Sequence, residues 1–320
     1  MKLIGIDLGG TKVTGAMFDS NGSLLYKTTR LIEGRKGLEV GSLMKNIIDF
    51  LIKVHSEGID AIAAIGICVP GIVNSKTGKV WAPNISGWEE YALQQEIEEY
   101  INQPHIKVSV DNDRTCYILG EVWKGAAQGC DNAIFVAVGT GIGAGILIDG
   151  RILHGLGDIV GAAGWMALET PYSEEYKACG YFETLASGNG IAKQAKKMIQ
   201  NGVFQKSIMN QKPTDSLTAY DVFAAYEQGD DLATQILDKA VQVWGMGAAN
   251  LVSLFNPEKI IWGGGVFGPA KQFIERIYDE AYKWAQPISI AQVKFEASKL
   301  SSDAGLFGAA YLALSSSKIQ

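Results

Sequence analysis

The chain has 320 residues, of which 47% are hydrophobic and 19% charged, which is enough to build a large buried core and two domains. Its formal net charge of −6 disfavours a general nucleic-acid-binding protein, because such proteins are more often basic. No run of about 18 apolar residues occurs, so no membrane-spanning segment is expected.

The first part of the chain alternates strand and helix patterns. Three consecutive stretches rich in β-formers and joined by tight turns predict antiparallel strands, and the apolar residues that follow recur at helical spacing. The predicted elements are strands at 2–6, 13–18 and 23–29, a helix at 38–55, a strand at 61–69, a helix at 88–101, a strand at 106–110 and a helix at 114–124.

The second part repeats this plan. Its predicted elements are strands at 132–138, 143–148 and 151–153, a long helix at 232–254, a strand at 259–262, a helix at 273–284, a strand at 293–297 and a helix at 304–314. This layout predicts an α/β fold that is duplicated once, with a central cleft between two lobes. We expect an N-terminal lobe at 1–112, completed by the C-terminal helix 304–320, and a C-terminal lobe at 113–303.

Two stretches share a pattern that is typical of phosphate binding. Asp7-Leu8-Gly9-Gly10-Thr11-Lys12 and Val138-Gly139-Thr140-Gly141-Ile142-Gly143 each join two strands through a Gly/Thr turn. Exposed N–H groups and a threonine hydroxyl in such a turn form an anion-binding nest. We expect one polyphosphate to lie over Gly9, Gly10 and Thr11 and over Gly139, Thr140 and Gly141, with Asp7 holding Mg²⁺ through water. A simple hairpin is an equally good interpretation of the first turn alone, and a solvated Lys12 is slightly favoured over a phosphate-binding one.

Other glycine-rich interpretations are weaker. The second stretch also satisfies Gly-x-Gly-x-x-Ala, but a strand and a turn follow it where a dinucleotide-binding fold requires a helix. Gly263-Gly264-Gly265 offers a flat surface for adenosine, although a crowded strand-to-helix crossover explains it better on its own.

Two acidic residues are candidates for the chemistry. Asp113 follows a predicted strand and is a candidate base for a substrate hydroxyl, or else the N-cap of the next helix, a position that Asp111 and Asn112 can also take. Glu183 can bind a sugar hydroxyl or merely occupy the favourable end of a helix dipole. His55, His105 and His154 show no ligand spacing and are interpreted as structural or surface residues. The four cysteines are unpaired in spacing, which indicates reduced thiols in a cytoplasmic protein.

Together these motifs resemble the ROK family (repressors, open reading frames and sugar kinases) nearly end to end. The resemblance is carried by the two glycine turns and by Val69-Pro70-Gly71, Ala82-Pro83-Asn84, Gly87-Trp88, Asn112-Asp113, Ala186-Ser187-Gly188, Leu254-Phe255-Asn256-Pro257-Glu258 and Gly263-Gly264-Gly265. It implies the actin/hexokinase-like (ribonuclease H-like) ATPase fold. It also implies a kinase that transfers the γ-phosphate of ATP·Mg²⁺ to a hydroxyl of a hexose or related sugar, often as a homodimer.

The resemblance also implies roles for individual residues. Asp113 matches the family's catalytic base, Asn112 and Glu183 match sugar contacts, and Gly71 and Asn84 lie where the family lines the sugar pocket. Gly264 and Gly265 border the adenosine. ROK repressors carry an N-terminal helix-turn-helix, and because this chain begins at the first strand, the repressor branch is disfavoured.

The chain departs from the family pattern in two places. Where the family carries Gly-Glu-x-Gly-His, this chain has Gly161-Ala162-Ala163-Gly164-Trp165, and only Cys179 is left of the family's cysteine run. The expected zinc ligands are therefore absent, and no structural zinc is expected. Because two hydroxyl-binding groups are lost, we expect a substrate other than plain glucose or a relaxed specificity. Trp165 then either stacks on the sugar or fills the volume left by the zinc loop.

Two further classes compete with the kinase hypothesis. A non-catalytic regulator that binds a sugar or nucleotide would explain the lost sugar contacts, but has no need of Asp7, Asp113 and both nests together. An actin-like filament protein shares the fold, but does not need Asn112-Asp113 and Glu183.

Overall fold

The computed structural model describes residues 1–54 and 58–317. His55, at the end of the predicted helix 38–55, and residues 318–320 of the predicted C-terminal helix lie outside the described residues. By its internal contacts the chain divides into two compact units. Unit 1 comprises Met1–Gly129, Ile152–Val160 and the chain from Ser302 onward, and unit 2 comprises Cys130–Arg151 and Gly161–Ser301.

Unit 1 is built on a five-stranded sheet in the order β3-β2-β1-β4-β7. The strands are β1 (Lys2–Leu8), β2 (Lys12–Asp19), β3 (Leu24–Leu31), β4 (Ile62–Val69) and β7 (Lys107–Asn112). β1, β2 and β3 pair antiparallel, whereas β4 lies parallel to both β1 and β7. A small hairpin of β5 (Ile72–Val73) and β6 (Val80–Trp81) follows β4.

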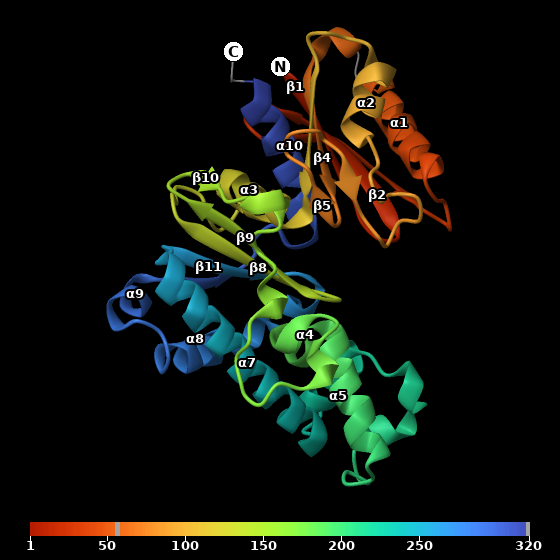
Figure 1. Cartoon of the computed structure of the whole chain (residues 1–320). Coiled ribbons are helices and arrows are strands. Elements are labelled where there is room, and N and C mark those ends of the chain that lie inside the picture. Colours follow the sequence, from red (N-terminus) through yellow and green to blue (C-terminus); the bar gives the residue numbers. More distant parts are fainter. Residues whose placement is uncertain (55–57, 318–320) are drawn as a thin grey trace. The chain divides into compact units, whose positions relative to one another are not determined.

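Helices cover both faces of this sheet. Ile4, Ile6 and Leu8 of β1 share one core with α1 (Leu38–Lys53) and α2 (Leu93–Ile101). Leu3 and Phe18 point to the other face, which α10 (Ala304–Ser317) covers together with α3 (Asp113–Lys124). This alternation of β1 residues between two cores follows from the two-residue period of a strand. Figure 1 shows the C-terminal helix α10, in dark blue, beside the N-terminal strands in red and orange.

Unit 2 repeats the sheet with the order β10-β9-β8-β11-β12. Its strands are β8 (Ala133–Val138), β9 (Ile142–Ile148), β10 (Arg151–Ile152), β11 (Lys259–Gly263) and β12 (Lys294–Ala297). Its helices are α4 (Gly180–Ala186), α5 (Gly188–Gln200), α6 (Ala219–Glu227), α7 (Asp231–Phe255), α8 (Ile274–Tyr282) and α9 (Pro287–Gln292). The predicted duplication of one α/β plan is thus present in the strand order of both sheets.

Two predicted helices are shorter in the structure. The helix expected at 88–101 begins only at Leu93, because Trp88 is fully buried, donates its indole N–H to the carbonyl of Gly37 at 3.1 Å and stacks on Tyr91. Tyr91 in turn forms an isolated β-bridge with Val80, so the chain turns and bends here and the helix starts only after this bridge. The helix expected at 273–284 is α8 (Ile274–Tyr282), preceded by a 3₁₀ turn at Ala270–Phe273.

The grouping of contacts also differs from the boundary expected after residue 112. α3 begins at Asp113 and packs closely on α10, so the chain remains in unit 1 up to Gly129. The segment Ile152–Val160 returns to unit 1 between two parts of unit 2. Over residues 1–54 and 58–317, the helices are too short or too polar to cross a membrane.

Candidate active site

Asp7 lies near the carboxyl end of β1, where three parallel strands of unit 1 end. It pairs in register with Cys68 of β4, whose thiol donates a hydrogen bond to its carboxylate. Burial raises the pKa of Asp7 to about 6; the Cys68 thiol opposes this rise, and the charge of Asp113 adds to it. A Cβ atom at Gly305 of α10 would lie 3.0 Å from the Asp7 carboxyl group, so the carboxylate rests against the first turn of that helix. Asp7 is therefore a buried carboxylate with a second one near it.

Asn112, and not Asp113, caps α3. The Oδ1 of Asn112 accepts a hydrogen bond from the Thr115 N–H at 3.0 Å, and its Nδ2 donates to Oδ1 of Asp111 at 3.0 Å. Both ends of its amide are thus engaged within the protein, and the residue is 4% exposed. This burial favours a structural role for Asn112, in addition to the sugar contact expected from the sequence.

Asp113 is the first residue of α3 and is released from the capping role. Its Oδ1 accepts the adjacent N–H of Arg114 at 2.8 Å. Burial raises the pKa of Asp113, and the charge of Arg114 opposes the rise. A carboxylate with a raised pKa is a stronger proton acceptor, which suits a general base.

The two glycine turns present open backbone. In the first, the N–H of Gly9 donates to the carbonyl of Lys12 at 2.9 Å, and a Cβ atom at Gly10 would meet nothing within 4 Å. In the second, the N–H of Gly139 donates to the carbonyl of Gly141 at 2.9 Å. β9 follows the second turn directly, so the turn does not open a helix and the dinucleotide-binding interpretation is excluded.

Gly71 and Asn84, the expected lining of a sugar pocket, lie in the turns around the β5–β6 hairpin. Gly71 has φ 95°, and a Cβ atom there would lie 2.1 Å from the carbonyl oxygen of Trp81. Packing alone therefore requires glycine at this position. Asn84 is exposed after β6.

Glu183 supports the second glycine turn from below. Its Oε2 accepts a hydrogen bond from the Ile142 N–H at 2.7 Å. Cβ atoms at Gly141 and Gly164 would lie 2.6 and 2.9 Å from the same oxygen. The Glu183 carboxylate on α4 thus holds the start of β9 in place. This structural role is separate from the sugar contact expected from the sequence.

Trp165 is 57% exposed, which argues against the idea that it fills the volume of a lost zinc loop. Tyr181 does more of this packing: it is 5% exposed, its ring meets Tyr176 edge-on at 5.1 Å, and its hydroxyl donates to the Glu169 carboxylate. Lys239 donates to the same carboxylate at 2.9 Å. Aromatic contacts and hydrogen bonds of Tyr181 and Glu169 therefore hold together the segment between Trp165 and α4, where the family pattern has its zinc ligands.

A cavity of about 860 Å³ in unit 2 joins several of the predicted residues. Gly139, Thr140 and Gly265 line it, whereas Gly264 does not. A Cβ atom at Gly264, which has φ 89°, would lie 2.4 Å from the carbonyl oxygen of Val138, so this glycine is required by packing. The crowded-crossover interpretation thus accounts for Gly264, and the open surface belongs to Gly265.

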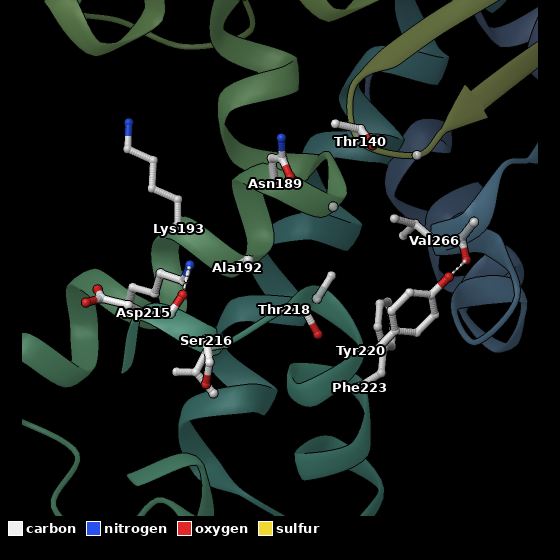
Figure 2. Close-up of a pocket in the computed structure, with 16 residues that line it drawn as sticks. Thr140, Asn189, Ala192, Lys193, Asp215, Ser216, Thr218, Tyr220, Phe223 and Val266 are labelled. Carbon is white, nitrogen blue, oxygen red and sulfur yellow. Dashed lines mark hydrogen bonds between the residues drawn. The ribbon is translucent and has the colours of Figure 1, made fainter. Parts of the chain in front are cut away.

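The rest of this cavity was missed by the sequence reasoning. Its walls come from α5, from α6 and the segment that leads into it, and from the turn after β11, as Figure 2 shows. The hydroxyl of Tyr220 donates to the carbonyl of Gly265 at 3.2 Å, and Phe223 lies on the same wall. Thr140 and Val266 stand on one side of the view, and Asp215 on the other. These wall residues share no spacing that marks a pocket in the sequence.

The N-terminus of α5 meets the second glycine turn. The N–H of Gly188 donates to the carbonyl of Gly139 at 2.8 Å, and Ser187 caps the helix by accepting the Gly190 N–H at 3.0 Å. A helix N-terminus beside a glycine turn favours an anionic group. The motif Ala186-Ser187-Gly188 was recognised in the sequence, but only as a resemblance.

The sequence indicates no partner for His154 and predicts a structural or surface residue; the structure shows that it is not isolated. It lies between the carboxylates of Asp111 and Asp158. Among residues 1–54 and 58–317, no three His, Cys, Asp or Glu side chains are grouped so as to hold a metal ion, and this holds for His154 and its two neighbours as well.

Comparisons with known proteins agree with this architecture. The model of the ROK family matches residues 3–316. A glucokinase of Halalkalibacterium halodurans is 31% identical over 97% of this chain and 94% of its own length. A xylose repressor of Caldicellulosiruptor bescii is 27% identical over 98% of this chain and 78% of its own length.

A solved structure extends the likeness to the fold. The ROK family glucokinase from Streptomyces griseus, in complex with glucose and AMPPNP, is 26% identical and superposes with a TM-score of 0.78 over 98% of this chain and 99% of its own. The expected actin/hexokinase-like ATPase fold is thereby confirmed. The family match over nearly the whole length shows that the chain belongs to the ROK family.

Proposed function

We propose that this protein is an ATP-dependent sugar kinase that transfers the γ-phosphate of ATP to a hydroxyl of a hexose or related sugar. The observation that carries the proposal is Asp113, a carboxylate at the start of α3 that is free of the capping role and whose pKa burial raises. Similarity to two glucokinases, one of them solved with glucose and AMPPNP, supports the same reaction.

In this reaction Asp113 accepts the proton of the sugar hydroxyl. The hydroxyl oxygen forms a bond to the γ-phosphorus, the bond from that phosphorus to the β–γ bridging oxygen breaks, and ADP leaves. Phosphoryl transfer depends mainly on positioning and on neutralising charge, so the base only has to be aligned and basic enough. The Arg114 N–H fixes one Asp113 oxygen at 2.8 Å and thereby aligns the carboxylate.

Unit 2 supplies the donor site in this proposal. The turn at Gly139-Thr140-Gly141 would offer the Thr140 hydroxyl to phosphates, and the N-terminus of α5 beside it would offer its helix dipole. The cavity beside them has the size of a small-molecule pocket and is walled by apolar side chains such as Val266 and Phe223. We assign it to the nucleoside, with Gly265 on its border.

We place a Mg²⁺ ion in unit 1. Asp7 and Asp113 are close enough for their charges to repel each other, and burial strengthens that repulsion. Asp7 would hold the ion through water, and a bound Mg²⁺ would neutralise negative charge on the phosphates. The first glycine turn, Gly9 to Thr11, lies beside this carboxylate and leaves open space at Gly10, and Lys12 is an exposed cation next to it.

The sugar contacts proposed here are Asn84, Gly71, Asn112 and Glu183, with Trp165 as an exposed aromatic surface. Because Ala162 and Trp165 offer no carboxylate or imidazole, hydroxyl recognition is weakened, and we propose a substrate other than plain glucose or a relaxed preference. A glucose-specific enzyme would contradict this part of the proposal.

An ATP-consumption assay over a panel of hexoses and amino sugars, with Mg²⁺ present, tests the function. We expect at least one sugar to stimulate ADP release and Asp113→Asn to lower kcat by about 10³-fold, because the base is lost while its shape is kept. Near-normal turnover in Asp113→Asn would refute the base assignment. A glucose kcat/KM far above that of every other sugar would refute the specificity part.

The similarity to a xylose repressor favours one second candidate, a non-catalytic regulator that binds a sugar or nucleotide. Calorimetric binding of sugar and ATP without any ADP release across the panel would support this candidate over the kinase.

A further inference from the structure

One side chain outside the proposed sites joins three segments of unit 1 that lie far apart in the sequence. His154 follows β10 in the segment Ile152–Val160, which returns to unit 1 between two parts of unit 2. Its Nε2 lies 3.8 Å from Oδ2 of Asp111, and its Nδ1 lies 3.7 Å from Oδ1 of Asp158. The imidazole therefore stands between two carboxylates, which are only 8% and 7% exposed.

Each carboxylate is held on its far side by backbone. Oδ2 of Asp158 accepts the N–H of Ser75 at 3.1 Å, in the turn that follows β5. Oδ1 of Asp111 accepts the N–H of Asn112 at 2.7 Å and its Nδ2 at 3.0 Å. A continuous set of contacts thus runs from Ser75 through the imidazole to the N-cap of α3.

The electrostatics of this set depend on the imidazole. Two buried carboxylates side by side are costly unless a positive charge or hydrogen bonds compensate them. Within residues 1–54 and 58–317, His154 is the only basic side chain in ion-pair range of Asp111 or Asp158. Burial raises the pKa of Asp111, the charge of His154 opposes this rise, and Asp158 adds to it.

The set ends at the proposed base. Asn112 accepts the Thr115 N–H at 3.0 Å and so fixes the first turn of α3. Asp113 lies in that turn, between Asn112 and Thr115. Any shift of Asp111 is passed to Asn112 through two short hydrogen bonds, and from there to the backbone that carries Asp113.

We propose that His154 is a positioning residue for the proposed kinase reaction: by bridging Asp111 and Asp158 it holds the Asn112 cap, and with it the Asp113 carboxylate, in the reactive place. This role rests on the proposed function, because the position of Asp113 matters for turnover only if Asp113 is the base. The contact network exists independently of that function.

The first test removes the imidazole. His154→Ala is expected to lower kcat by about 10-fold or more, since small misplacements of a catalytic group are costly. The KM for ATP should stay within about twofold, because the proposed nucleoside cavity belongs to unit 2. His105→Ala is the matched control: that histidine is exposed on the loop before β7, and its removal should leave both constants unchanged. An equal loss in both variants, or none in His154→Ala, would overturn the proposal.

The second test is a rescue. Asp158→Asn placed in the His154→Ala protein removes one buried charge and keeps an oxygen for the Ser75 N–H. It should restore kcat to within about threefold of the wild type, which a loss of packing alone would not allow. Failure to recover would mean that charge compensation is not the role of His154. Should His154→Ala not fold, His154→Gln, which keeps an N–H donor without the charge, takes its place in both tests.

The third test does not depend on activity. The Thr115 amide, which the cap protects, should exchange with solvent about 10-fold faster in His154→Ala and at the wild-type rate in His105→Ala. If the wild-type protein shows no kinase activity but Thr115 still exchanges faster in His154→Ala, the role of His154 in holding the cap is supported and only the proposed function is refuted. Unchanged Thr115 exchange would overturn the positioning role itself.

Discussion

The two sheets of this protein have the same strand order but carry different chemistry. The residue before the last of β1 is Asp7, and the corresponding residue of β8 is Ala137. β7 ends in Asp111-Asn112, whereas β12 ends in Glu296-Ala297. The glycine turn after the first strand is common to both sheets, but only in unit 1 does a carboxylate, Asp7, stand just before it. The repeated backbone plan thus has its glycine turn twice and the acidic residue before that turn once.

The cores differ in the same way. In unit 1, a Cβ atom at Gly66 of β4 would lie 1.8 Å from the carbonyl of Ala309, so α10 touches the sheet backbone directly. In unit 2, Trp262 of β11 stacks on Phe267 at 4.8 Å, and Trp244 meets the same ring at 5.2 Å. In unit 1, helix α10 therefore packs closely on the sheet next to the carboxylates, whereas large aromatic rings fill the core of unit 2.

Gly308→Ala tests the tight packing of unit 1 and should have the largest effect. A Cβ atom there would lie 1.7 Å from the carbonyl oxygen of Cys116 on α3, a contact that backbone cannot relieve locally. We expect a loss of about 3 kcal/mol in the free energy of unfolding, measured by urea denaturation. Gly268→Ala in unit 2 is the control, because its φ is −65° and its nearest atom lies at 3.5 Å; equal losses would contradict the contrast between the two cores.

Asp7→Asn tests whether the buried carboxylate of Asp7 lowers the free energy of unfolding. The pKa of Asp7 is raised from 3.8 to about 6, so the folded protein prefers the protonated acid. Ionisation above pH 6 therefore opposes folding, and this penalty disappears as the pH falls toward 4. In EDTA at pH 7 we expect Asp7→Asn to be more stable than the wild type by about 2 kcal/mol.

The pH dependence distinguishes this cause from others. The stability difference between Asp7→Asn and the wild type should shrink steadily when urea denaturation is repeated from pH 7 down to pH 4.5. A variant that is less stable at pH 7, or a difference that grows on acidification, would show that Asp7 is not strained by its burial.

The same contrast shows what the sequence could predict. The strand order and the two glycine turns follow from local patterns, since strand periodicity and turn residues act over a few positions. The sequence indicates Asp113 as a candidate base because it follows a strand, but it offers three candidates for the N-cap of the next helix. Only the structure resolves this, because the hydrogen bond from Thr115 N–H to Asn112 depends on the local backbone path.

Long-range contacts account for the failures. α2 begins later than predicted because the indole N–H of Trp88 donates to the carbonyl of Gly37, 51 positions away. His154 looked isolated because one of its partners, Asp111, lies on a strand far earlier in the chain. The cavity that we assign to the nucleoside is not visible in the sequence because its walls come from α5, α6 and the turn after β11, and apolar or lysine residues on helices are ordinary.

Gly305→Ala tests the link between packing and chemistry in unit 1. The added methyl group would lie 3.0 Å from three atoms of the Asp7 carboxyl group and must displace it by a few tenths of an ångström. We expect kcat to fall about 10-fold, with a higher Mg²⁺ requirement, in steady-state assays. Gly268→Ala again serves as control. Unchanged kcat and Mg²⁺ dependence would mean that the position of Asp7 does not matter for turnover.

Tyr220→Ala tests the separate role of unit 2 and should have the smallest effect. The side chain is 63% exposed, lines the cavity and clasps Gly265 at 3.2 Å, so its removal opens one wall without a large loss of stability. We expect the KM for ATP to rise about fivefold while kcat and the KM for sugar stay within about twofold, because a wall of the nucleoside cavity affects binding and transition state alike. Tyr220→Phe keeps the ring and removes only the hydroxyl, so it should lie between. If Tyr220→Ala lowers kcat as much as Gly305→Ala does, the proposed division is wrong. Unit 2 would then take part in the chemical step and not in donor binding alone.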